Sequence, residues 1–330
     1  MDPLRFTREL IDIESITGNE AQVGDFLAER LGKLGFMVQK GPVERHRFNV
    51  LALSPGTTPA VVFSTHMDTV PPFIPSWEDE RRIYGRGACD AKGIIAAQTA
   101  AAIRLRDEGL ATGLLFVVGE EKDSLGAKTA NEHPIGNKFL VNGEPTENKI
   151  ALASKGTLRV ELIAEGKMAH SAYPELGDSA IDKLVEALYR MKKMHLPHND
   201  EIGPSTLNIG VIEGGRAPNV IADHARAQLL IRLVGPSEDI RRNIVDSLRG
   251  LVKVEFPLEI AYQKMKVIPG LPTMIAAFTT DIPKMPAWGE PILIGPGSIH
   301  VAHTEKEFID KEQLMQAVDI YYRIGQELSM

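Results

Sequence analysis

Histidines and acidic residues in this sequence follow short apolar runs, at positions where buried strands would end. They are His66 and Asp68, Asp90, the adjacent pair Glu120 and Glu121, Glu144, and His303 with His300 nearby. Imidazole and carboxylate groups together are the donors that suit a pair of divalent, zinc-like ions. Ligands of open α/β sheets bind beyond the carboxyl ends of the strands. We therefore expect these side chains to meet at that edge of a sheet.

Each feature alone has an ordinary structural explanation. A lone histidine after a strand is more often a hydrogen-bonded structural residue, and paired glutamates usually form a solvated face. Their joint occurrence at successive strand ends argues against coincidence. Two ions about 3.5–4 Å apart need a bridging carboxylate and activate a water molecule between them. A free carboxylate must then carry the proton of that water to the leaving nitrogen. In an adjacent pair such as Glu120 and Glu121, one residue can bind metal while the other stays free.

The elements that must position these residues alternate between helix and strand over the first 150 residues. Apolar periodicity predicts a helix over 19–34, with Asn19 as its cap and Gly35 as its stop, and an Ala-rich crossover helix over 92–108. Short apolar runs predict buried strands of a mainly parallel sheet. These runs are 48–53, 60–65, 114–119 and 138–142.

The pattern changes near Ser154. Alternating apolar and polar residues predict strands over 157–165, 206–213, 224–233 and 251–260, with helices over 178–193 and 236–249. This βαββαβ order is typical of a small two-layer α+β domain. From residue 264 the first pattern returns, with a strand near 292–294 and a final helix over 311–328. We expect a catalytic domain of residues 1–154 and 264–330 that carries an inserted domain of residues 155–263.

Charge and composition argue against several classes of function. The formal net charge of −7 is spread along the chain and argues against nucleic-acid binding, which needs a basic face. Cys89 is the single cysteine, so an intrachain disulfide is excluded, and we expect it to be a buried structural residue. The N-terminal segment does not resemble a secretory signal, and no apolar run reaches the 18 residues of a membrane span. We therefore expect a cytoplasmic protein without membrane partners.

At the metal-ligand candidates, the sequence resembles the M20 metallopeptidase family. This family includes acetylornithine deacetylase, succinyl-diaminopimelate desuccinylase, aminoacylase-1 and glutamate-releasing carboxypeptidases. The resemblance spans nearly the whole chain and rests on the segments HMD at 66–68, GRGACDAKG at 85–93, the pair at 120–121, GEPT at 143–146 and AHT at 302–304. It implies a mainly parallel mixed sheet flanked by helices, of the zinc exopeptidase type. It also implies an inserted ferredoxin-like dimerisation domain.

The resemblance also implies a role for each residue. His66 would bind one metal ion and be oriented by Asp68, and Asp90 would bridge both ions. Glu120 would be the catalytic base and Glu121 a ligand. Glu144 would complete the first metal site and His303 the second, with His300 as the rival of His303. Family members often carry Asp before the glutamate pair, where this chain has Gly119.

The inserted domain has similar segments. KMAHSAYP at 167–174 resembles the family segment whose histidine, here His170, stabilises the oxyanion in the partner subunit, which implies a homodimer. GGRAPNV at 214–220 implies a substrate contact by Asn219. The resemblance also implies that Arg232 binds the substrate carboxylate, and that Gly295 and Gly297 form a turn over that end of the substrate.

The implied activity is hydrolysis of an amide bond with two divalent ions, zinc first and cobalt or manganese as alternatives. We expect deacylation of an N-acyl amino acid, as in acetylornithine deacetylase, because Glu at position 144 is common among deacylating members. A dipeptidase or carboxypeptidase acting on short peptides is the alternative. A non-catalytic binding protein on the same fold is disfavoured by the presence of Glu120. A nucleotide-binding protein is disfavoured because the chain lacks GxGxxG and Walker segments.

Overall fold

The computed structural model describes residues 1–56 and 58–329, which divide into two compact units. Unit 1 consists of Met1–Leu152, Met265–Met274 and Thr280–Met330. Unit 2 consists of Ala153–Lys264 and Ile275–Thr279. The inserted segment expected at 155–263 lies within unit 2, but the short return at 275–279 was not predicted from the sequence.

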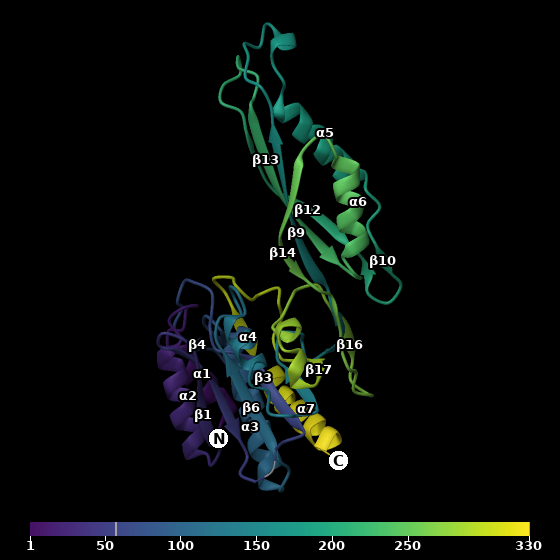
Figure 1. The fold of residues 1–330 in the computed structure, drawn as a ribbon. Helices are drawn as coiled ribbons and strands as arrows, with labels where there is room; N and C mark the ends of the chain where they lie inside the picture. Colours follow the sequence, from purple (N-terminus) through teal and green to yellow (C-terminus); the bar gives the residue numbers. More distant parts are fainter. Residues whose placement is uncertain (57, 330) are drawn as a thin grey trace. The chain divides into compact units, whose positions relative to one another are not determined.

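Unit 1 is built on a six-stranded sheet with the strand order β1-β2-β6-β3-β7-β17 (Figure 1). The strands are β1 (Met37–Glu44), β2 (Arg47–Leu53), β3 (Val61–His66), β6 (Thr112–Val117), β7 (Phe139–Asn142) and β17 (Glu290–Leu293). The pairs β6·β3, β3·β7 and β7·β17 are parallel, whereas β1·β2 and β2·β6 are antiparallel. The predicted mixed, mainly parallel sheet is confirmed.

Helices cover both faces of this sheet (Figure 1). They are α1 (Pro3–Ile11), α2 (Ala21–Lys33), α3 (Gly93–Asp107), α4 (Leu125–Asn131) and α7 (Lys311–Ser329). Phe63 on β3 packs into a core with α1, α2, α3 and α7, while its neighbour Val62 packs on the opposite face with α4 and Trp288. Successive side chains of a strand point to opposite faces, so a strand covered on both sides is apolar throughout. This explains why the central strands appear in the sequence as continuous apolar runs.

Unit 2 contains a four-stranded antiparallel sheet with the order β12-β13-β9-β14. Its elements follow the predicted order β9 (Gly156–Glu165), α5 (Ala180–Lys193), β12 (Thr206–Gly214), β13 (His224–Leu233), α6 (Glu238–Leu248) and β14 (Lys253–Ile260). Figure 1 shows α5 and α6 on one face of the sheet. Alternate residues of β13 are buried against these helices, because only one face of the sheet is covered.

Short strands complete the fold. In unit 1, β5 (Arg82–Tyr84) pairs antiparallel with both β4 (Trp77–Glu78) and β18 (Phe308–Asp310). A second small sheet has the order β15-β8-β16, from β8 (Ile150–Ser154), β15 (Gln263–Lys264) and β16 (Thr273–Ala276). β10 (His198–Asn199) pairs with β11 (Gly203–Pro204) in unit 2. Among the helices of residues 1–56 and 58–329, none combines the length and hydropathy that a membrane crossing requires.

The structure differs from the sequence-based expectation at several elements. Helix α1, strand β1 and helix α4 were not predicted. A signal for α1 was present, because Asp2 accepts the Leu4 N–H at 3.0 Å as a cap and Pro3 occupies the first helical position. The expected cap of α2, Asn19, is replaced by Glu20, whose side chain makes no capping hydrogen bond. Glu20 instead binds Arg47 on β2 through two hydrogen bonds.

We predict that Phe63→Ala destabilises unit 1 by about 3–5 kcal/mol, because it leaves a cavity under the central strand. Phe63 is fully buried and meets the Tyr321 ring edge-on at 5.6 Å between centroids. Urea unfolding followed by tryptophan fluorescence measures this, since both tryptophans, Trp77 and Trp288, lie in unit 1. The matched control Phe73→Ala removes a side chain that is 37% exposed and should cost far less. Equal losses in both variants would contradict the prediction.

Candidate metal centre

The parallel strands of unit 1 carry the acidic and imidazole groups to one edge of the sheet. His66 is the last residue of β3, Glu120 and Glu121 follow β6, and Glu144 follows β7. Because β3, β6 and β7 are parallel neighbours, their carboxyl ends lie at the same edge. Asp90 lies in the turn Ala88–Lys92 that leads into α3.

Two groups of side chains meet at this edge, and Asp90 belongs to both. Ligand atoms of His66, Asp90 and Glu144 lie within 4.8 Å of one another, as do those of Asp90, Glu121 and His303. His66 Nε2 is 2.9 Å from Asp90 Oδ1, and His303 Nε2 is 3.3 Å from Asp90 Oδ2. His303 Nε2 is also 2.9 Å from Glu121 Oε1. Asp90 therefore turns one oxygen to each imidazole, as a bridging carboxylate would.

The donor set fits a pair of divalent ions. Two donors bound at about 2.0–2.1 Å to one tetrahedral ion lie about 3.3 Å apart, close to the nitrogen–oxygen distances found here. Glu144 is buried, and its Oε1 has no hydrogen-bond partner among residues 1–56 and 58–329. A buried carboxylate oxygen without a partner is costly. Burial, followed by the charges of Glu120 and Asp90, raises the pKa of Glu144 well above its usual value, and a bound cation would relieve that cost.

The two imidazoles respond to the same negative field. Hydrogen bonds to Asp90 and Glu121 raise the pKa of His303 to about 10. Burial lowers the pKa of His66, but its contacts with Asp68 and Asp90 outweigh burial and raise that pKa well above its usual value. The site thus attracts positive charge, whether as protons or as metal ions.

Glu120 stands apart from both groups of metal-ligand candidates. Burial raises its pKa well above the usual range, and the charges of Asp281 and Glu121 add to this effect against the opposing influence of His66. A carboxyl group that has a raised pKa and lies outside the metal-ligand groups is suited to carry a proton.

Asp68 has two functions in the structure. Its carboxylate accepts the N–H groups of Gly119 and Glu120 at 2.9 and 3.1 Å through Oδ1, and that of Glu121 at 3.3 Å through Oδ2. Its main-chain carbonyl accepts the hydrogen bond from His66 Nδ1 at 2.9 Å, while Oδ1 is 3.6 Å from that nitrogen. The carbonyl thus makes the close contact to His66 that the resemblance implied for the side chain. The carboxylate fixes the turn that carries the glutamate pair.

Two other candidates lie outside the groups. His300, the rival of His303, is exposed and belongs to neither group of donors among the described residues. Cys89 is buried as expected, and burial, together with Glu307 and Asp90, raises the pKa of its thiol well above the usual value. A thiol in such surroundings is a poor nucleophile.

In unit 2, the structure brings His170 and Asn219 together and separates them from Arg232. Both His170 and Asn219 are exposed; His170 pairs with Val220 in an isolated β-bridge, and the Ser171 N–H donates to the Asn219 carbonyl at 3.1 Å. Arg232 lies near the far end of β13, roughly 26 Å along the strand from its first residue. Arg232 Nη1 donates to Thr157 Oγ1 at 2.7 Å, and burial lowers the pKa of Arg232.

Gly295 and Gly297 are packed tightly in unit 1. A Cβ on Gly295 would lie 2.5 Å from the Glu144 carbonyl oxygen, and one on Gly297, where φ is +88°, would lie 2.4 Å from Cys89 Cβ. Their N–H groups donate within the protein, to Thr146 Oγ1 at 2.9 Å and Gln313 Oε1 at 2.8 Å. The structure therefore gives these glycines a packing role beside Glu144 and Asp90. Their contact with a substrate stays a prediction.

Two further residues near this edge were not predicted from the sequence. Thr17 donates its hydroxyl to Asp68 Oδ2 at 2.7 Å. Asp281 is buried, one of its oxygens has no partner among residues 1–56 and 58–329, and burial raises its pKa to about 6. Neither follows a predicted strand or belongs to a recognisable segment, so only the folded chain reveals them.

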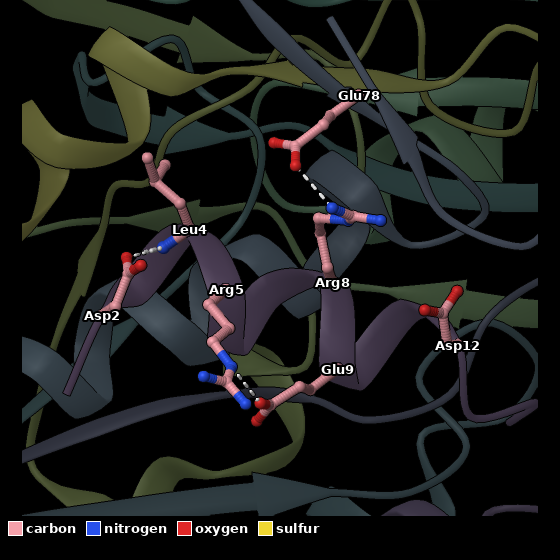
Figure 2. A pocket seen from close by; sticks show the side chains of 7 residues that line it. All are labelled: Asp2, Leu4, Arg5, Arg8, Glu9, Asp12 and Glu78. Carbon is pink, nitrogen blue, oxygen red and sulfur yellow. Dashed lines mark hydrogen bonds and ion pairs between the residues drawn. The ribbon is translucent and has the colours of Figure 1, made fainter.

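A surface hollow of about 540 Å³ beside α1 contains none of the predicted site residues (Figure 2). It is lined by Asp2, Leu4, Arg5, Arg8, Glu9, Asp12 and Glu78. Figure 2 shows Arg5 paired with Glu9 and Arg8 paired with Glu78, so both arginines are already neutralised. Neither arginine is therefore left to attract an anionic ligand into the hollow.

Known proteins resemble this chain over nearly its whole length. Residues 152–257 match the family model described as the peptidase dimerisation domain of M20. A peptidase M20 domain-containing protein of Schizosaccharomyces pombe is 39% identical, over 96% of this chain and 82% of the relative. A probable carboxypeptidase of Aspergillus terreus is 37% identical, over 97% of this chain and 85% of the relative.

Solved structures share the fold. The aminopeptidase PepT of Bacillus cereus superposes with a TM-score of 0.84 at 21% identity, covering 99% of this chain and 98% of that one. An M20 family metallo-carboxypeptidase of Sulfolobus solfataricus superposes with a TM-score of 0.76 at 17% identity, covering all of both chains. Taken with the identity to the curated relatives, the chain belongs to the M20 peptidase family of metal-dependent hydrolases.

Proposed function

We propose that this chain hydrolyses an amide bond next to a free carboxylate with two zinc ions bound at the Asp90 site. The observation that carries the proposal is the position of Asp90, whose two oxygens face His66 and His303 separately. His66 and Glu144 would hold one ion, and Glu121 and His303 the other. When bound, such a pair lowers the pKa of a water molecule and polarises the scissile carbonyl.

Glu120 is the proton carrier in this proposal. Its raised pKa allows it to hold the proton taken from water and then release it to the leaving nitrogen. Asp68 holds the N–H groups of both Glu120 and Glu121, which keeps the base next to a ligand without making it one. The presence of Glu120 in this environment is what disfavours a non-catalytic binding protein.

The surroundings of Arg232 favour a substrate that carries a carboxylate. It is half-buried and forms no ion pair among the residues that the structure describes, so its guanidinium keeps donors without a counter-ion. A planar guanidinium binds a carboxylate through two parallel hydrogen bonds. Curated relatives described as probable carboxypeptidases favour a peptide substrate for this chain too.

The second candidate is deacylation of an N-acyl amino acid, as in acetylornithine deacetylase. The feature in its favour is Glu144, because the resemblance associates Glu at this position with deacylating members. Both substrates present the same amide and the same carboxylate, so the two activities require the same centre. The cytoplasmic location expected from the sequence remains part of the proposal.

We further propose that the active form is a homodimer in which His170 serves the partner subunit. The match of residues 152–257 to a dimerisation domain supports this. β12 is an edge strand, and Val185 and Tyr189 on α5 are 61% and 60% exposed, which leaves an apolar surface for a second copy. His170 and Arg232 lie far apart within one unit, so they would reach one substrate more readily from different copies.

A substrate screen tests the proposed activity. Zinc-loaded protein is offered dipeptides and short peptides, acetyl- and succinyl-amino acids, and the same peptides with an amidated C-terminus. We expect cleavage of free peptides and a loss of about 10- to 100-fold in kcat/KM on amidation, since a charged hydrogen bond is removed. Preference for acyl-amino acids would favour the second candidate. Absence of hydrolysis with every substrate would reject the proposal.

Replacing the proton carrier separates catalysis from metal binding. We expect Glu120→Gln to lower kcat by about 100- to 10,000-fold while metal content stays at the parental level. Elemental analysis and steady-state kinetics measure the two quantities. Glu132→Gln, at an exposed position that follows α4, is the matched control and should change neither. A parental kcat in Glu120→Gln would show that another group moves the proton.

Mixed dimers test the role of His170 in the partner subunit. His170→Ala and Glu120→Gln should each be inactive alone. When the two are co-expressed, random pairing makes half the dimers mixed, and each mixed dimer has one site with both groups intact. We therefore expect about one quarter of the parental activity. A mixture as inactive as its components, with mixed dimers shown by differential tagging, would place His170 in its own subunit's site.

A further inference from the structure

A buried ion pair connects the two segments that carry Asp90 and His303. Arg86 precedes Asp90 by four residues, and Glu307 follows His303 by four. Arg86 Nη1 lies 2.6 Å from Glu307 Oε2, and the exposed fractions of the two side chains are 2% and 0%. β5 and β18 pair next to them, and the Gly85 N–H donates to the Glu307 carbonyl at 3.2 Å. The segments that carry Asp90 and His303 therefore adjoin the same end of the β5·β18 strand pair.

Glu307 holds the main chain of the Asp90 turn. Its Oε1 accepts the N–H groups of Cys89 and Asp90, each at 3.2 Å. One carboxylate oxygen is thus bound to the turn while the other is bound to Arg86. Because the peptide unit of Asp90 is fixed in this way, its side chain can present one oxygen to each imidazole.

Arg86 makes two further contacts with main-chain carbonyls. Its Nη1 also donates to the Thr304 carbonyl at 3.2 Å, and its Nε donates to the Pro72 carbonyl at 3.3 Å. Thr304 directly follows His303, and Pro72 lies in the segment that follows His66 and Asp68. A planar guanidinium has several donors in fixed directions, and this lets one side chain bind Glu307, Thr304 and Pro72 together.

His303 needs such support more than the other candidate ligands. Its side chain is 48% exposed, whereas the side chains of Asp90 and Glu121 are 5% and 7% exposed. Its φ of +64° lies in the left-handed region, which few residues other than glycine adopt. Packing alone therefore does not fix His303, and the hydrogen bond from Arg86 to the next carbonyl restrains its backbone.

We propose that Arg86 and Glu307 are positioning residues that set the spacing between Asp90 and His303 and thereby the affinity for the ion held by Asp90, Glu121 and His303. This inference rests on the proposed two-ion site. We call the two residues the clamp. It touches neither substrate nor ion and acts through the main chain of Asp90 and Thr304.

Zinc titration against a competing chelator, without substrate, tests the clamp in Glu307→Gln and Arg86→Lys. A carboxamide in place of the Glu307 carboxylate has only one acceptor oxygen, so it cannot accept hydrogen bonds from both Arg86 and the turn. A lysine ammonium in place of the Arg86 guanidinium cannot reach Thr304 and Pro72 while it binds Glu307. We expect at least one of the two zinc-binding steps to lose about 10- to 100-fold in affinity.

Asp310→Asn is the matched control. Arg82 and Asp310 connect the same strand pair at 2.9 Å, but their side chains are 41% and 44% exposed and contact neither ligand segment within the described part of the chain. Urea unfolding of the metal-free proteins shows which variants fold. If Glu307→Gln does not fold, the milder Glu307→Asp takes its place in the titration. Both binding steps should stay at parental affinity in Asp310→Asn.

Two results would overturn the clamp. One is parental affinity for both zinc ions in folded variants of Arg86 and Glu307. The other is an equal loss of zinc affinity in Asp310→Asn, because any ion pair between β5 and β18 would then be enough to position the ligands. The titration uses no substrate, so a protein that binds two ions but hydrolyses nothing rejects the proposed function and leaves the clamp standing. A parental protein that binds no zinc pair rejects the clamp.

Discussion

Carboxylates repel one another, and the repulsion grows when burial removes the water between them. At the edge of the unit 1 sheet, Asp90, Glu121 and Glu144 converge beside Glu120, and Glu144 keeps a buried oxygen without a partner among the described residues. Such an arrangement is stable only with compensating positive charge. The raised pKa values of His66 and His303 reflect the same requirement, because the neighbouring carboxylates favour the protonated, positively charged form of each imidazole. Packing and hydrogen bonding in unit 1 must hold these groups together against their repulsion.

The rest of unit 1 supplies that restraint. The parallel strands align the loop ends, and Asp68 holds the glutamate turn through three N–H groups. Arg86 and Glu307 connect the Asp90 turn to the His303 segment. Every metal-ligand candidate found in the described chain lies in unit 1. Unit 2 contains the polar groups proposed to contact substrate, His170, Asn219 and Arg232, together with an open sheet edge. The candidate metal centre and these three proposed substrate contacts thus belong to different units.

Much of this arrangement was predictable because it depends on local patterns. Buried strands appear as apolar runs, and donors placed directly after such runs must share an edge when the strands are parallel. The order of elements in unit 2 followed from alternation and helical periodicity in the same way. Interactions between distant segments could not be predicted. Arg86 and Glu307 are 221 residues apart, and neither residue's neighbours indicate the other. Asp281 and the carbonyl contact from Asp68 to His66 likewise depend on tertiary packing, and helix α4 is too short for a periodic signal.

Whether two metal ions share Asp90 can be seen by anomalous scattering from crystals of the zinc-loaded protein. Data collected on both sides of the zinc absorption edge locate each ion independently of any assumption about its ligands. We predict two peaks about 3.5–4 Å apart on either side of the Asp90 carboxylate, one beside His66 and Glu144 and one beside Glu121 and His303. A single peak, or peaks that do not contact Asp90, would contradict this prediction.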